Sequence, residues 1–148
     1  MGVTVKCRKT GKGYDLSYNG FRRFRERVAH LLNEEFGTHY AKLPSLAEKF
    51  AFDNGSDRCK LAFDEFDRET EKLIAKHKIN KRAVNFLFQP DTDGKIPPSV
   101  CKIIYAVIKD YDDNICYGYA GRSDCAMFSD LKAVFKDCCD TNSCLIWR

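Results

Sequence analysis

The chain has 148 residues, a formal net charge of +4, and 44% apolar and 13% aromatic residues. This length and composition fit one packed domain over residues 1–148 and exclude a disordered chain. The sequence holds no apolar run long enough for a transmembrane helix, and its start lacks the apolar stretch of a signal peptide. We therefore expect an intracellular protein without membrane contact, whose eight cysteines stay reduced.

Positive charge is concentrated at the start of the chain. Residues 1–27 hold eight basic and two acidic side chains, a net charge of +6, so the rest of the chain carries −2. A basic end on a slightly acidic body indicates an anionic partner, which can be a nucleotide, a nucleic acid or a nucleic-acid-binding protein. The sequence leaves open whether the chain also forms a homo-oligomer.

The first predicted elements are a β-hairpin and an amphipathic helix. Residues 3–7 and 14–18 alternate apolar and polar side chains around the glycine-bearing segment KTGKG, as two paired strands do. Asn19 can then cap a helix whose apolar side chains recur at helical spacing, and Gly37 is placed to end it.

The middle of the chain is predicted to be helical with one irregular stretch. Residues 38–55 are broken by a proline and a turn-like DNG, although residues 45–52 can form a short helix. A clearer helix follows from about residue 57 to residue 78, and Asn80 can cap another short one through residue 88.

The last third alternates loops with helices. Residues 89–98, QPDTDGKIPP, are predicted to form a loop, and residues 99–109 a largely buried helix. A long loop over residues 112–128 leads to a helix capped by Ser129. Residues 144–147 have the composition of a final strand that can add to the hairpin.

These elements predict an α+β fold. A small antiparallel sheet, made of the N-terminal hairpin and the C-terminal strand, packs against four to five helices. No internal repeat or linker divides the chain.

The hairpin turn is the first candidate binding segment. Arg8, Lys9 and Lys12 surround two glycines, which let backbone N–H groups approach phosphate oxygens while the side chains supply charge. The segment lacks the P-loop pattern GxxxxGK[ST], so its alternative interpretation is a solvated turn.

Arginines at the start of the first helix are the second candidate. Arg22, Arg23 and Arg25 lie among aromatic positions, so the helix is expected to bury its aromatic side chains and present guanidinium groups outward. Arginine suits bidentate recognition of phosphate or carboxylate, although a solvated helix face explains the pattern equally well. If this arc and the hairpin turn share one surface, they form one anion-binding region.

The long loop is the third candidate, centred on the run YGYAGR. Tyr117 and Tyr119 alternate around a glycine and face one way in an extended chain, where they can stack on a base or a peptide. Arg122 can hold a phosphate, and Asp124 can accept a hydrogen bond from a ribose hydroxyl. The alternative is an ordered loop that packs its tyrosines onto the core.

Metal binding and cysteine catalysis have weaker support, and no cofactor is expected. Cys125, Cys138, Cys139 and Cys144 lie within twenty residues, but they form no CxxC pair, so we expect no metal site. Cys125 has a neighbouring arginine that would favour its thiolate, yet no histidine lies near it in the sequence. A small cysteine-dependent enzyme therefore remains an alternative to a protein without catalytic activity.

Two blocks, MGVTVKCRKTGKGYDLSYNGF and DYDDNICYGYAGRSDCAMFSDLK, resemble a group of small uncharacterised proteins encoded by bacterial phages and other mobile elements. The resemblance implies the cytoplasm of a bacterial host cell and a role in binding. It favours an anti-defence inhibitor that acts on a nucleic-acid-handling defence protein or a nucleotide signal. The alternative is a nucleic-acid-binding accessory protein of the mobile element.

Overall fold

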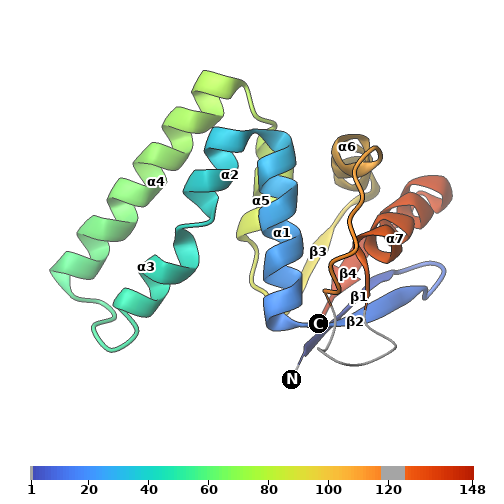
Figure 1. Cartoon of the computed structure of the whole chain (residues 1–148), viewed down its shortest axis with the longest axis horizontal. Helices are drawn as coiled ribbons and strands as arrows, with labels where there is room; N and C mark the ends of the chain where they lie inside the picture. The colour runs from blue at the N-terminus through green and yellow to red at the C-terminus, as the bar shows by residue number, and fades with distance from the viewer. Residues whose placement is uncertain (1, 118–125) are drawn as a thin grey trace.

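The computed structural model describes residues 2–117 and 126–148, which Figure 1 shows as a ribbon. Their strands form one antiparallel sheet in the order β2-β1-β4-β3, with β1 at Gly2–Cys7, β2 at Gly13–Ser17, β3 at Gly94–Ile96 and β4 at Leu145–Trp147. β1 and β2 make the predicted hairpin, and β4 pairs with β1 as the predicted C-terminal strand. The α+β fold is therefore confirmed.

The helices of the described residues are α1 (Tyr18–Leu32), α2 (Glu34–Tyr40), α3 (Leu43–Lys49), α4 (Asp57–His77), α5 (Lys81–Phe88), α6 (Pro98–Ile108) and α7 (Phe128–Thr141). The long first helix predicted from the sequence is two helices, because the side chain of Asn33 accepts a hydrogen bond from the Phe36 N–H over 3.0 Å and starts α2 there. Gly37 lies inside α2 and does not end a helix.

Two helix starts differ from the sequence prediction by one or two residues. Ser17, and not Asn19, caps α1, because its hydroxyl accepts a hydrogen bond from the Gly20 N–H over 2.9 Å. α7 begins just before Ser129, where the Asp130 carboxylate accepts a hydrogen bond from the Met127 N–H over 2.9 Å.

β3 corrects the prediction of a loop over residues 89–98. Its three residues pair with β4 in the register Gly94↔Trp147 and Ile96↔Leu145. A Cβ at Gly94 would come within 2.0 Å of the Trp147 indole, so only glycine lets this ring pack against β3. The three residues of β3 include one large apolar side chain, so their own preference for a strand is weak. Pairing with β4 therefore makes this segment a strand.

One hydrophobic cluster holds the sheet and most of the helices together. The inward side chains of β1, Val3, Val5 and Cys7, are buried in it, together with residues of α1, α6 and α7. These three helices therefore lie on one side of the sheet (Figure 1). α3 and α4 extend away from the sheet on the side of α2, and α3 contributes no buried residue.

Candidate anion-binding face of the sheet

The side of the sheet opposite the helices carries the candidate site. The strands alternate, so the neighbours of the buried core residues point outward: Lys6 between Val5 and Cys7, and Ile146 between Leu145 and Trp147. No helix of the described residues packs on this side, because α1, α6 and α7 share a cluster with the inward side chains. Arg8, Lys95 and Arg148 are exposed on this side, and Lys6 and Ile146 are half-buried.

Strand pairing brings basic residues from distant parts of the sequence together. Lys6 and Lys95 both pair with Ile146, one from β1 and the other from β3. Because neighbouring strands lie about 4.8 Å apart, the two lysines flank Ile146 at a backbone separation of roughly 10 Å. Arg8 and Arg148 continue the outward rows of β1 and β4. Lys6, Arg8, Lys95 and Arg148 are here called the basic face.

A groove lies on this side of the sheet. Its volume is about 400 Å³, and its lining includes Arg8, Lys95, Ile146 and Arg148, with Asp93 as its acidic residue. Across residues 2–117 and 126–148, none of the four cations of the basic face forms an ion pair. Their charge is therefore available to a phosphate or carboxylate of a partner.

Lys95 is held in place by a side chain from outside the sheet. The amide of Gln89 donates to the Lys95 carbonyl over 3.0 Å and accepts from the Lys95 N–H over 3.1 Å. This pairing satisfies the backbone of Lys95 along the free edge of β3, as a neighbouring strand would. The edge is thus closed to a further strand, and the Lys95 ammonium group is left facing outward.

The other basic residues of the hairpin turn are directed toward α7. The Lys9 ammonium group donates to the carbonyl of Thr141, the last residue of α7, over 3.0 Å. The Lys12 ammonium group lies 4.0 Å from the Asp137 carboxylate. Of the three predicted turn residues, Arg8 alone lines the groove, whereas Lys9 and Lys12 interact with α7.

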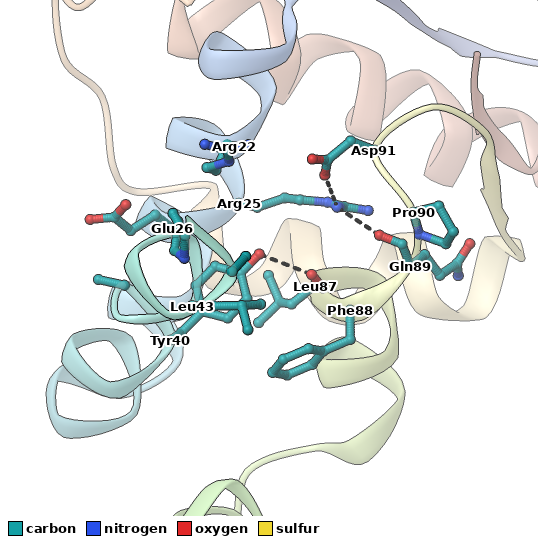
Figure 2. A pocket seen from close by; sticks show the side chains of 13 residues that line it. Arg22, Arg25, Glu26, Tyr40, Leu43, Leu87, Phe88, Gln89, Pro90 and Asp91 are labelled. Carbon is teal, nitrogen blue, oxygen red and sulfur yellow. Dashed lines mark hydrogen bonds and ion pairs between the residues drawn. The ribbon is translucent and has the colours of Figure 1, made fainter. Parts of the chain in front are cut away.

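The expectation that Arg22, Arg23 and Arg25 face outward is wrong for Arg25. Arg22 and Arg23 are exposed, but Arg25 is only 2% exposed. Its Nη1 atom donates to the Gln89 carbonyl over 2.8 Å and to Oδ1 of Asp91 over 2.7 Å, as Figure 2 shows. Burial lowers the pKa of this guanidinium, although Asp91 opposes the shift.

Three aromatic rings enclose the Arg25 guanidinium. Its central carbon lies 4.5 Å from the ring centroid of Phe21 and 5.3 Å from those of Phe86 and Trp147. Nε and Nη2 have no hydrogen-bond partner among the described residues, and cation–π attraction to the rings compensates part of their burial. Arg25 is therefore a core residue that cannot contact a surface ligand.

A second cavity lies beside Arg25 and is drawn in Figure 2. Its volume is about 250 Å³. Arg22 and Arg25 line it together with Glu26 and Asp91, so its cations and carboxylates balance. The lining has no excess positive charge, and the basic face of the sheet fits an anionic partner better.

The hairpin turn and the α1 arginines do not form one surface. β2 runs from the turn to the start of α1, so the two segments lie at opposite ends of that strand (Figure 1). The structure instead joins Arg8 to Lys6, Lys95 and Arg148. The sequence signal for Lys6 was the alternation of apolar and polar residues over residues 3–7, whereas Lys95 joins this surface only because β3 pairs with β4.

Tyr117 does not offer a stacking surface. Its side chain is fully buried, its ring packs against Phe24 and Phe128, and its hydroxyl donates to Oδ2 of Asp113 over 3.2 Å. Burial and the nearby Asp113 carboxylate raise the pKa of its hydroxyl. The predicted role of Tyr117 is thus wrong, and Tyr119, Arg122 and Asp124 lie outside the described residues.

The two thiols whose pKa is lowered, those of Cys7 and Cys101, are buried in the core. Seven cysteines are free, and no group of metal-ligating side chains is found in the part of the chain that the structure describes. Burial of the Cys7 thiol opposes ionisation, but hydrogen bonds with the hydroxyls of Thr10, Ser143 and Thr141 outweigh it and lower its pKa to about 6. Cys7 is fully buried, so a substrate does not reach it. Cys125 lies outside the described residues.

Comparisons with known proteins add no family to this description. No family model, no curated protein and no solved structure matches the chain. Among the helices of residues 2–117 and 126–148, none combines the length and the apolar character needed to cross a bilayer.

Proposed function

We propose that this chain is a binding protein without catalytic activity whose partner is a nucleic acid. The partner's phosphates contact the basic face, formed by Lys6, Arg8, Lys95 and Arg148. The observation that carries the proposal is the row Lys6–Ile146–Lys95, in which two lysines from distant parts of the chain flank one apolar residue on the outward side of the sheet.

The chemistry of the face favours recognition of the backbone over recognition of bases. The outward residues of the described strands include lysine, threonine, aspartate and isoleucine, and none of them is aromatic. Single-stranded nucleic acids are commonly bound through bases that stack on aromatic side chains, which this face does not provide. Contacts with phosphates position a nucleic acid without reading its sequence.

The positive charge of the basic face also distinguishes between the two roles that the resemblance to mobile-element proteins implies, an anti-defence inhibitor and a nucleic-acid-binding protein. An inhibitor that fills the nucleic-acid groove of a defence nuclease must replace phosphates, so it needs an acidic surface. The basic face has the opposite sign. A nucleotide signal would need an enclosed pocket, whereas the groove is open to solvent on the sheet. A nucleic-acid-binding protein of a mobile element fits the face best.

Salt dependence of binding tests this proposal. Fluorescence anisotropy with labelled duplex and single-stranded DNA and RNA, over a series of salt concentrations, gives the slope of log K against log salt. Each phosphate contact contributes about −0.9 to this slope on duplex DNA and about −0.7 on a single strand. Lys6→Gln, Arg8→Gln and Lys95→Gln together should weaken binding and make the slope shallower by roughly 2–3.

A matched control carries the same loss of charge elsewhere. Lys12→Gln, Arg22→Gln and Arg23→Gln together also remove three positive charges, but from α1 and the α7 side of the turn. This control should keep the wild-type slope. Equal losses in both triple variants, or no binding to any nucleic acid at low salt, would overturn the proposal.

A further inference from the structure

Asp93 is an exposed acidic side chain in the lining of the groove on the basic face. It directly precedes β3, and continuing the β3–β4 register by one residue places it opposite Arg148. Along its own chain it lies two residues before Lys95, a separation of about 7 Å, which puts both side chains on the same side of an extended strand. The Asp93 carboxylate therefore has cations as neighbours in two directions, along the strand and across the sheet.

Neither of these cations neutralises the Asp93 carboxylate. Among residues 2–117 and 126–148 it forms no ion pair, whereas Asp91 is held by Arg25 at 2.7 Å. An ionised carboxylate offers hydrogen-bond acceptors and no donor, so it repels phosphates. A partner that brings a hydrogen-bond donor as well as phosphates therefore fits this groove better than one that brings phosphates alone.

The backbone of RNA has this combination of groups. A ribose lies between each two successive phosphates of a strand, and its 2′-hydroxyl can donate a hydrogen bond, whereas deoxyribose has no such group. In the groove, a carboxylate adjoins two cations, Lys95 and Arg148. The two cations complement two phosphates, and the carboxylate complements the hydroxyl between them. With DNA, the carboxylate would adjoin phosphates without gaining a hydrogen bond.

The width of the sheet also favours an RNA duplex over a DNA duplex. Three spacings of about 4.8 Å make the four-stranded sheet roughly 14 Å wide between its outer backbones. The grooves of B-form DNA are about 6 and 12 Å wide, and the wider one admits a helix or a two-stranded ribbon. A-form RNA has a wide and shallow minor groove that displays its 2′-hydroxyls, so a broad sheet can reach them from outside.

We propose that the basic face binds double-stranded RNA, and that Asp93 accepts a hydrogen bond from a 2′-hydroxyl between two phosphates held by Lys95 and Arg148. This inference rests on the proposed function, because it assigns the kind of nucleic acid that the basic face binds. Asp93 is then a specificity-determining residue. It favours RNA through the hydrogen bond and disfavours DNA through repulsion of the phosphates.

Fluorescence anisotropy with three duplexes of one sequence tests this assignment: RNA, DNA and 2′-O-methyl RNA, which stays A-form but lacks the hydroxyl donor. The wild type should bind RNA more tightly than either of the others. Asp93→Ala should lower the ratio of RNA affinity to DNA affinity by roughly three- to tenfold, because one hydrogen bond is lost with RNA alone. It should also bind RNA and 2′-O-methyl RNA alike. Asp93→Asn keeps an acceptor oxygen and should retain part of the preference.

Asp15→Ala is the matched control, because Asp15 is an exposed carboxylate on the same side of the sheet, paired with Thr4 and outside the lining of the groove. It removes the same charge and should keep the wild-type ratio. Equal wild-type affinity for the RNA and DNA duplexes, or an Asp93→Ala chain with the wild-type ratio, would overturn this inference and leave the proposed function standing. Binding to none of the duplexes at low salt would overturn both.

Discussion

Nη1 of Arg25 lies 2.7 Å from Oδ1 of Asp91 and thereby ties α1 to the linker between α5 and β3. The same nitrogen donates to the carbonyl of Gln89, so one buried group holds two points of this linker. The linker leads directly into β3, the strand that carries Lys95. A core arginine that was expected to bind a ligand therefore helps to position a residue of the basic face.

Two more buried side chains satisfy carbonyls in the same region. The Tyr40 hydroxyl donates to the Leu87 carbonyl near the end of α5, and the Trp147 indole N–H donates to the Pro90 carbonyl, each over 2.9 Å. Carbonyls at the end of a helix lack partners within the helix, and buried ones need other donors. Side chains from α2 and β4 supply them here, which fixes the course of the linker.

The Arg25–Asp91 ion pair predicts a coupled loss of stability. Asp91→Ala should lower the free energy of unfolding by about 1.5–3 kcal/mol, because a hydrogen bond to a charged and buried group is lost. In a chain that already carries Arg25→Met, Asp91→Ala should leave the free energy of unfolding almost unchanged. Urea denaturation of the four chains of this double-mutant cycle measures the difference.

Asp93→Ala is the control for this cycle, since Asp93 lies on the same linker and is exposed. It should leave the free energy of unfolding within about 0.5 kcal/mol of the wild type. If Asp91→Ala costs the same amount with and without Arg25, the ion pair does not stabilise the linker.

Local sequence patterns predicted the parts of the fold that depend on neighbouring residues. The alternation in residues 3–7 correctly predicted a strand, and in the structure Val3, Val5 and Cys7 face the core while Lys6 lies on the other side. β3 could not be predicted in this way, because its three residues form a strand only against β4. The groove of the basic face depends on that pairing, so the sequence named Arg8 as a candidate binding residue but did not name Lys95.

Local sequence patterns do not show contacts between distant residues, which also explains the wrong prediction for Arg25. Within the run of arginines at the start of α1, helical spacing places Arg25 four residues after Phe21, at the border of the apolar side. Its burial is decided by Phe86 and Trp147, which approach from α5 and β4. Tyr117 is a similar case, because Phe128 on α7 covers its ring. Contacts between residues far apart in sequence determined both outcomes.

A buried histidine predicts how stability depends on pH. His39 on α2 stacks on Phe66 of α4 at 4.1 Å, and its Nε2 lies 2.8 Å from the Thr70 hydroxyl. That hydroxyl donates to the Phe66 carbonyl, so it accepts the Nε2–H of a neutral His39. Burial lowers the pKa of His39 below its ordinary value of 6.5.

Because the pKa of His39 is lower in the folded chain, the unfolded chain takes up this proton first as the pH falls. The contribution of neutral His39 to stability should therefore be complete above pH 6.5 and decline below it, by up to about 1.4 kcal/mol per pH unit. His39→Gln should be less stable at neutral pH, but its free energy of unfolding should fall less steeply between neutral and mildly acidic pH. Equal pH slopes for the two proteins would contradict the role of His39.

At the contact between α1 and residue 117, adding one methyl group to Gly20 should lower the free energy of unfolding. A Cβ at Gly20 would lie 1.4 Å from the Tyr117 carbonyl oxygen, so the backbone of that segment must move away from α1 in Gly20→Ala. We expect the free energy of unfolding to fall by about 1–3 kcal/mol, although alanine is the better helix former by about 1 kcal/mol. Asn19→Ala, at the exposed neighbouring position, should change it by less than about 0.5 kcal/mol. Thermal and urea unfolding of both variants measure the difference, and a Gly20→Ala chain at least as stable as the wild type would show that α1 and Tyr117 are not in this close contact.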